Sequence, residues 1–140
     1  MPTTKSEALR SFRYLNNDVT VHADASDTNG QYAILEMRSV PGSEPPMHIH
    51  QNADEMFIVI EGKMNVIIAG VERVLSAGES ATVKRGTPHT FKILTPSMRS
   101  FAVITPAGFE EFFRAFANDP APGWDRIGQV AAQHGTRLLV

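Results

Sequence analysis

Hydrophobic residues between positions 31 and 105 fall into short runs, several of which alternate with polar positions. Glycine and proline interrupt the runs at turn sites such as Pro41-Gly42, Ala69-Gly70 and Ala77-Gly78. A period of two is typical of a half-buried β-strand. The pattern therefore predicts strands at residues 32–38, 47–50, 55–60, 64–69, 71–75, 80–83, 89–94 and 98–105.

These strands predict an all-β fold. No helical pattern separates them, which argues against a parallel α/β sheet. Many short strands joined by tight turns are typical of a sandwich or barrel built from hairpins. The runs 55–60 and 64–69, joined by Glu61-Gly62-Lys63, form the clearest predicted hairpin.

The two ends of the chain differ from this central pattern. The first thirty residues are mostly polar, with a short predicted strand at 19–22 and a dense group of turn formers at 24–30. Near the C-terminus, Phe109, Phe112, Phe113 and Phe116 recur at helical spacing, and a second short helix is predicted at about 125–134. The phenylalanine stripe is expected to be the buried face of a helix packed on the sheet, and it could also roof the mouth of a barrel.

We therefore divide a single domain into an N-terminal segment at 1–30, a β-barrel at 31–105 and a helical segment at 106–140 packed on the barrel. The length of 140 residues fits one domain, and 42% hydrophobic residues are enough for a buried core.

Composition excludes several classes of protein. Thirteen basic residues against fifteen acidic ones give a net charge of −2, which argues against a nucleic-acid-binding protein. The absence of cysteine excludes disulfides, thiolate metal sites and a cysteine nucleophile. The apolar runs are too short to cross a membrane, and the N-terminus lacks the apolar stretch of a signal peptide, so we expect a cytoplasmic protein.

The candidate chemistry lies on four residues among the predicted strands. His48 and His50 are two apart on an extended segment, so both imidazoles point to the same side. Glu55 opens the next strand, where the chain return can bring its carboxylate beside them, and His89 begins a later strand. Three imidazoles and a carboxylate form a mixed nitrogen and oxygen ligand set that suits one divalent transition metal, namely Fe, Mn, Ni, Co, Cu or Zn.

The same residues lie in two motifs that resemble those of the cupin superfamily. The first motif comprises Gly42, His48, His50, Glu55 and Gly62, and the second comprises Gly78, Gly86 and His89. The chain departs from the usual family pattern at Lys84, where proline is common, and at Ile93, where asparagine is common. At all four positions where the family binds its metal, this chain carries a residue that can ligate a metal.

This resemblance implies a double-stranded β-helix, or jelly-roll barrel, with one or two C-terminal helices. It also implies a metal bound by His48, His50, Glu55 and His89, and a homodimer. The C-terminal segments 105–113 and 132–139 resemble those of small bacterial cupins described as quercetin-dioxygenase-like. We expect the predicted strand at 19–22 to pair across the dimer interface, because an open barrel leaves an unpaired edge.

Alternation along the strands also predicts the walls of a substrate pocket. On the strand 98–105, either Phe101, Val103 and Thr105 or Ala102 and Ile104 face inward. The candidate lining residues are Phe57, Val59, Phe91, Ile93, Met37 and Phe101. Such a pocket is apolar and suits a small aromatic or apolar substrate.

Three functions are compatible with these features. The first is a metal-dependent dioxygenase in which Glu55 is both a metal ligand and the catalytic base. The second is a non-redox metal isomerase or lyase acting on a carbonyl compound. The third is a module that binds a small ligand without turnover. In each case the expected partner is a small molecule, and neither a nucleic acid nor a membrane.

Overall fold

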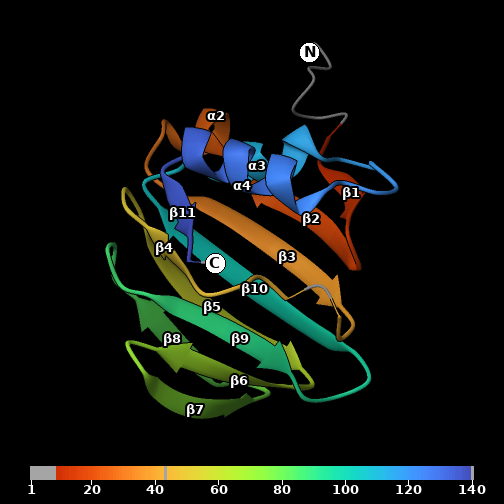
Figure 1. Ribbon diagram of the computed structural model, residues 1–140, viewed down its shortest axis with the longest axis vertical. Helices are drawn as coiled ribbons and strands as arrows, with labels where there is room; N and C mark the ends of the chain where they lie inside the picture. Colours follow the sequence, from red (N-terminus) through yellow and green to blue (C-terminus); the bar gives the residue numbers. More distant parts are fainter. Residues whose placement is uncertain (1–8, 43, 140) are drawn as a thin grey trace.

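The computed structural model describes residues 9–42 and 44–139, which form two stacked antiparallel β-sheets with short helices at one end (Figure 1). The all-β class and the two C-terminal helices predicted from the sequence are confirmed. The first eight residues of the predicted N-terminal segment lie outside the described part of the chain. No helix in the described ranges is long and apolar enough to cross a membrane.

The larger sheet has six strands in the order β1-β2-β3-β10-β5-β8. Burial alternates strictly along the central strand β10, because every second side chain faces the interior between the sheets. The strands are β1 (Ser11–Tyr14), β2 (Asn17–Ala23), β3 (Ala33–Ser39), β10 (Met98–Thr105), β5 (Asp54–Glu61) and β8 (Ser80–Val83).

The smaller sheet has five strands in the order β11-β4-β9-β6-β7. Its strands are β11 (Thr136–Leu138), β4 (His48–His50), β9 (His89–Ile93), β6 (Lys63–Ile68) and β7 (Val71–Ser76). The three-residue strand β11 was not predicted. It pairs with β4 and so brings the C-terminal segment back against the two histidines of that strand.

Helices α3 (Glu110–Ala115) and α4 (Trp124–Gln133) lie over one end of the sandwich (Figure 1). Phe112 and Phe116 pack there with Ile127 and with apolar side chains of β2 and β3 in one hydrophobic cluster. A second cluster fills the space between the sheets at the other end, around Val59 and Val66. The predicted phenylalanine stripe is thus a core face.

The predicted hairpin between residues 55–60 and 64–69 is wrong, although both strands exist. β5 belongs to the six-stranded sheet and β6 to the five-stranded sheet, so the turn at Gly62 carries the chain from one sheet to the other. Gly62 has a φ of +87°, and a Cβ at this position would lie 2.6 Å from the carbonyl oxygen of Ser97. This close approach fixes the crossing, and β6 instead forms its hairpin with β7.

The N-terminal segment is not separate from the barrel. β2 pairs with β1 on one side and with β3 on the other, so the six-stranded sheet extends into the segment that we assigned to residues 1–30. The expectation that 19–22 pairs across a dimer interface is therefore wrong, because both edges of β2 are occupied within the chain. The turn-forming segment contains a short helix, α2 (Ala25–Thr28). Formation of a homodimer stays a prediction.

Candidate metal centre

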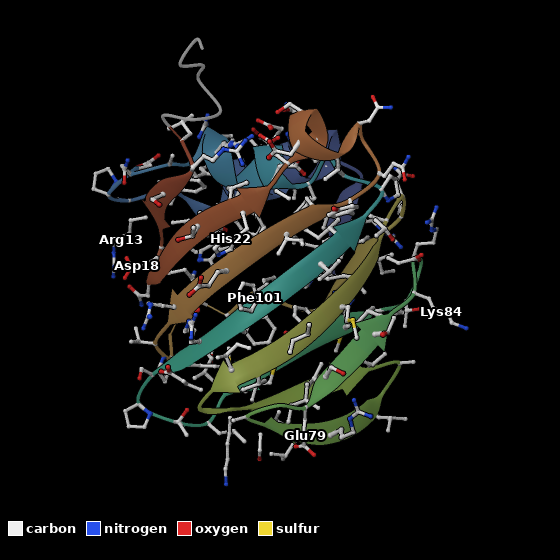
Figure 2. The ribbon with its side chains drawn as sticks, turned by 180° about the vertical axis from the view of Figure 1, so that it is seen from behind. Arg13, Asp18, His22, Glu79, Lys84 and Phe101 are labelled. Atoms are coloured by element: carbon white, nitrogen blue, oxygen red, sulfur yellow. The ribbon has the colours of Figure 1, made fainter. Side chains whose placement is uncertain are left out.

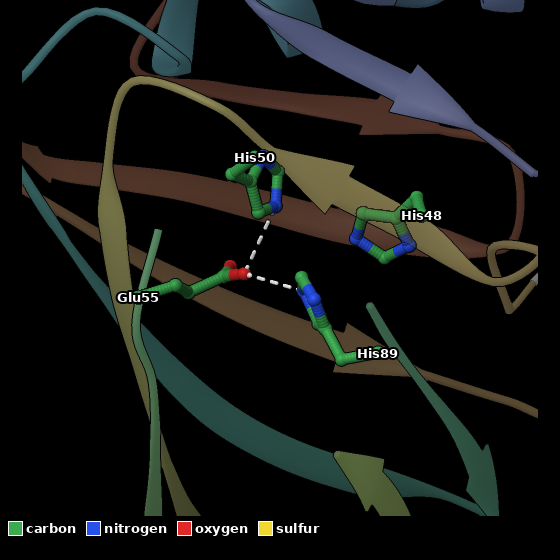
Figure 3. Close-up of side chains that lie close together, drawn as sticks. All are labelled: His48, His50, Glu55 and His89. Carbon is green, nitrogen blue, oxygen red and sulfur yellow. Dashed lines mark ion pairs between the residues drawn. The ribbon is translucent and has the colours of Figure 1, made fainter. Parts of the chain in front are cut away.

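The four candidate side chains come from both sheets and converge between them (Figure 3). His48 and His50 lie on β4 with their side chains on one face, as the period of two requires. His89 begins β9 directly opposite His48 in the antiparallel pair. Glu55, near the start of β5, reaches them from the six-stranded sheet. The sandwich therefore supplies three imidazoles from one wall and a carboxylate from the other.

The group is compact and sheltered from solvent. One ligand atom from each residue lies within 4.8 Å of the others. Glu55 Oε1 is 3.1 Å from His50 Nε2 and 3.4 Å from His89 Nε2. The His89 ring has no exposed surface, and the His50 and Glu55 side chains are 10% and 11% exposed.

Hydrogen bonds orient all three imidazole rings from behind. His48 Nδ1 is 2.8 Å from the Pro46 carbonyl oxygen, and His89 Nδ1 is 2.9 Å from that of Thr87. A carbonyl only accepts, so each Nδ1 carries a proton, and Nε2 of each ring is the nitrogen that points toward the centre. His50 Nδ1 lies 2.6 Å from the Thr136 hydroxyl.

The electrostatic environment keeps the ligands in their metal-binding forms. Burial lowers the pKa of His48 to about 4, with the neighbouring His89 and His50 adding to the effect, so His48 is neutral at pH 7. Burial alone would raise the pKa of Glu55, but its interactions with His50 and His89 outweigh burial and hold that pKa well below the usual range. The carboxyl group is therefore ionised.

The donor set fits a divalent transition metal. Among the described residues, Glu55 Oε1 and His89 Nε2 are buried side-chain atoms without a hydrogen-bond partner. Lone pairs of imidazole nitrogens and a carboxylate oxygen repel one another unless a proton or a metal cation lies between them. Metal–ligand bonds of about 2 Å suit these donor atoms and their separations of 3.1 and 3.4 Å. The His/Glu cluster could thus bind a metal ion.

A cavity of about 100 Å³ extends from His48, His50 and Glu55 into the space between the sheets. Most of its wall is apolar, and Phe57, Phe91, Ile93 and Met37 line it as the alternation had suggested. The α3 side of the wall includes Phe109, whose ring meets that of His50 edge to face at a centroid distance of 4.8 Å. The predicted stripe therefore also roofs the cavity.

Two of the expected pocket residues lie elsewhere. Val59 has no exposed surface and packs in the cluster at the other end of the sandwich, not in the cavity wall. Phe101 is on the outer face of the six-stranded sheet, where its ring lies 5.4 Å from that of His22 (Figure 2). Burial along β10 shows that Ala102 and Ile104 point inward, so the other alternation pattern holds on this strand.

Several polar residues at this site were not predicted from the sequence. Thr136 bonds to His50 from β11, and Asn17, Ser39, Ser100 and Glu44 line the cavity. Ser100 could not be assigned from the sequence, because the inward face of its strand was undecided until the two sheets were seen to pack. Thr136 carried no signal in the sequence, since its contact with His50 joins residues 86 positions apart.

Comparison with known proteins identifies the fold and the family. The cupin domain model matches residues 35–104, which are 70 of the 140 residues. No curated protein sequence matches the chain.

Similar solved structures support the assignment of the fold. KdgF from Halomonas sp. is 18% identical with a TM-score of 0.64, over 71% of this chain and 89% of that one. An RmlC-like cupin from Shewanella frigidimarina is 20% identical with a TM-score of 0.63, over 74% and 90% of the two chains. A predicted oxalate decarboxylase from Thermotoga maritima is 17% identical with a TM-score of 0.64, over 75% and 99%. The fold is therefore the jelly roll that the motifs implied, and the chain belongs to the cupin family.

Proposed function

We propose that this protein is a metal-dependent dioxygenase that acts on a small, largely apolar or aromatic substrate. The observation that carries the proposal is the convergence of His48, His50, Glu55 and His89 at one end of an apolar cavity. In this proposal the four residues hold one divalent ion of Fe, Mn, Ni, Co, Cu or Zn. Four protein ligands on a six-coordinate ion leave two positions for substrate and dioxygen.

The bound ion would supply Lewis acidity toward a substrate oxygen and, for a redox-active metal, reactivity with dioxygen. The protein contributes position and proton transfer. Hydrogen bonds to Pro46, Thr87 and Thr136 fix the imidazole rings. The ionised carboxylate of Glu55 accepts the proton of a substrate hydroxyl, so the substrate reacts as its anion.

The cavity wall supports the choice of substrate class. Aromatic rings of Phe57, Phe91 and Phe109 surround the space next to the four ligands. Within the described part of the chain, neither lysine nor arginine lines the cavity. A phosphorylated sugar would lack a cationic partner there, whereas a planar aromatic ring would pack against these side chains.

The first test is metal content and oxygen consumption. Protein purified without chelator or added metal is analysed by mass spectrometry, and oxygen uptake is then recorded with flavonols, diketones and catechols. We expect about one equivalent of metal, and oxygen uptake that matches substrate loss. The variant His89→Ala should lose both, whereas His22→Ala, on the outer face of the sheet, should retain both.

The other possible functions give different results in the same assays. Turnover that continues without oxygen would indicate a metal isomerase or lyase and not a dioxygenase. Stabilisation by a ligand without any product would indicate a binding module. His89→Ala protein that still binds one equivalent of metal would show that the ligands are assigned incorrectly.

A further inference from the structure

A polar patch lies on the inner face of the six-stranded sheet, inside the otherwise apolar cavity. Asn17 on β2 pairs with Ser39 on β3, and Ser39 pairs with Met98 on β10. Ser100 is two residues further along β10 and so is a diagonal neighbour of Ser39 on the same face. Asn17, Ser39 and Ser100 are only 9%, 5% and 8% exposed, and all three line the cavity.

The hydrogen bonds of this patch are incomplete. The Ser39 hydroxyl donates to Asn17 Oδ1 at 2.6 Å, and Asn17 Nδ2 donates to the Tyr14 carbonyl oxygen at 3.0 Å. Across residues 9–42 and 44–139, the Ser100 hydroxyl has no partner. The Ser100 hydroxyl lines the cavity and is not sealed from it, so a group that enters the cavity meets a hydrogen-bond donor and acceptor already in place.

The patch is at the end of the cavity away from the metal centre. Ile104 pairs with Glu55 across β10 and β5, and Ser100 lies four residues before Ile104 on the same strand. At the rise of an antiparallel strand, this separation is about 13 Å between backbone positions. Because the side chains project into the cavity, a ligand that contacts both ends spans roughly 10 Å.

The charge at this end is negative. The Glu44 carboxylate lines the cavity and accepts hydrogen bonds from the backbone N–H groups of Gly42 at 2.8 Å and Ile93 at 3.0 Å. Burial raises the pKa of Glu44, but hydrogen bonds from backbone N–H groups, with the nearby charge of Lys92 adding to them, outweigh burial and lower it, so the side chain is ionised at neutral pH. This end of the cavity therefore favours a neutral group that donates a hydrogen bond and disfavours a carboxylate or phosphate.

We propose that Ser100 and Glu44 form a distal subsite for a substrate hydroxyl group. This inference rests on the proposed function in one respect: it takes one end of the ligand to bind the metal. The substrate class is then an elongated phenol, with a metal-binding oxygen at one end, an aromatic body, and a second hydroxyl roughly 10 Å away. Ser100 and Glu44 determine specificity and take no part in the reaction.

Two matched probes test the subsite. 4-Phenylcatechol carries the chelating end and the aromatic body, and 4-(4-hydroxyphenyl)catechol adds the distal hydroxyl. Binding to Zn²⁺-loaded protein is measured by calorimetry without oxygen, because Zn²⁺ has no redox chemistry. We expect the wild type to bind the hydroxylated probe about five- to tenfold more tightly, which is the effect of one hydrogen bond.

The variant Ser100→Ala should bind both probes equally, with wild-type affinity for 4-phenylcatechol and undiminished thermal stability. Ser11→Ala, an exposed serine on β1, is the matched control and should keep the wild-type preference. Glu44→Gln should improve the binding of 4-(4-carboxyphenyl)catechol relative to wild type, because it removes a like charge.

Several outcomes would overturn the subsite. The first is a wild type that binds the two probes equally. The second is a Ser100→Ala variant that keeps the preference for the hydroxylated probe. The third is failure of both probes to bind the metal-loaded protein. The proposed function fails separately: if the preference depends on Ser100 but no substrate consumes oxygen, the subsite stands and the dioxygenase does not.

Discussion

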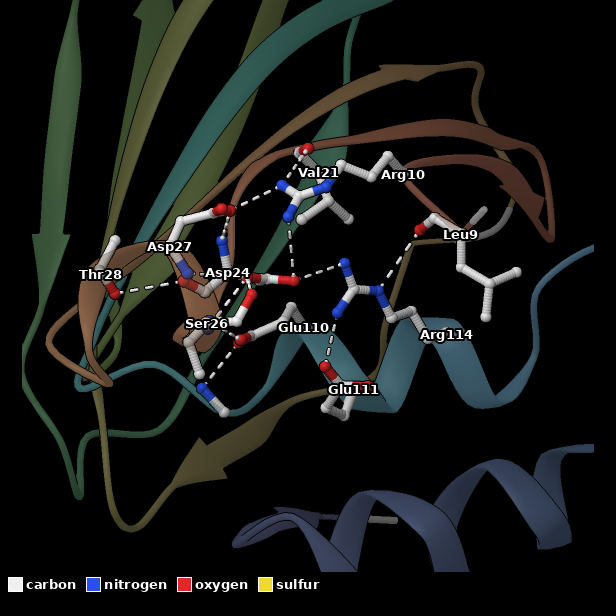
Figure 4. A network of polar contacts seen from close by, with 12 residues as sticks. Leu9, Arg10, Val21, Asp24, Ser26, Asp27, Thr28, Glu110, Glu111 and Arg114 are labelled. Carbon is white, nitrogen blue, oxygen red and sulfur yellow. Dashed lines mark hydrogen bonds and ion pairs between the residues drawn. The ribbon is translucent and has the colours of Figure 1, made fainter. Parts of the chain in front are cut away.

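Removing the charge of Asp24 should destabilise the fold, because this carboxylate joins the N-terminal segment to helix α3 (Figure 4). Asp24 is 1% exposed and caps α2 by accepting hydrogen bonds from the backbone N–H groups of Ser26 and Asp27. Its Oδ2 is 2.9 Å from Arg114 Nη2 of α3 and 3.4 Å from Arg10 Nη2. The variant Asp24→Asn keeps a capping oxygen, but it removes the charge and replaces the oxygen that faces the two arginines by an N–H donor.

The size of the effect follows from the burial of both partners. The Arg114 side chain is 4% exposed, and loss of one member of a buried ion pair costs about 3–5 kcal/mol. In the variant, Arg114 Nη1 still pairs with Glu111 Oε2 at 2.6 Å. We therefore expect the free energy of unfolding to fall by an amount near the lower end of this range, about 3 kcal/mol. For a domain of this size, that loss lowers Tm by about 10 °C.

The pH dependence gives an independent check. Burial raises the pKa of Asp24, but hydrogen bonds from Ser26 and Arg114 outweigh it and hold the pKa well below the usual range. Stability from a lowered carboxyl pKa is present above the pKa of the unfolded chain, about 3.9, and is lost as the pH falls toward the folded value. The difference in free energy of unfolding between wild type and Asp24→Asn should therefore be constant near neutral pH and become smaller below about pH 4.

The assay is urea unfolding of wild type and variants across this pH range. Asp18→Asn is the control, because Asp18 pairs with Arg13 at the surface, with side chains 63% and 55% exposed. It should lose no more than about 0.5 kcal/mol. A loss of stability in Asp24→Asn no larger than that in Asp18→Asn, or a difference from wild type that stays unchanged in acid, would contradict a stabilising role for the Asp24 charge.

Two further predictions concern single contacts. Thr136→Val removes the hydroxyl 2.6 Å from His50 Nδ1 and should weaken metal affinity roughly 10- to 100-fold in a chelator competition, with the fold intact; an unchanged affinity would contradict a role in orienting His50. Gly62→Ala should lose more stability in urea unfolding than Gly70→Ala, because both glycines have positive φ but only Gly62 places a Cβ within 2.6 Å of the Ser97 carbonyl oxygen. Equal losses at the two positions would show that backbone strain alone determines the cost.

The local features of the fold could be predicted from the sequence. Strands such as Ser80–Val83 and Met98–Thr105 are bounded by glycine and proline turns, and their residues alternate between core and surface. The spacing of His48 and His50 placed both imidazoles on one face, because side chains on a strand repeat every two residues. Elements with neither signal, such as β11, were missed.

Features that depend on distant contacts were decided by the tertiary structure. The turn at Gly62 looked like a hairpin, but the chain there passes from one sheet to the other. The inward face of β10 was open in the sequence, because both of its faces carry apolar residues, and packing between the sheets placed Phe101 outside.

The sequence was enough to locate most of the strands, because they depend on local spacing, and the four candidate metal ligands, because they lie in two motifs that resemble those of the cupins. Packing in three dimensions was needed to show which strands pair, that Thr136 supports His50, and that Ser100 and Glu44 face the same cavity. Those contacts join residues far apart in the chain. They form only when the two sheets and the C-terminal helices pack around a common core, and no local pattern encodes that arrangement.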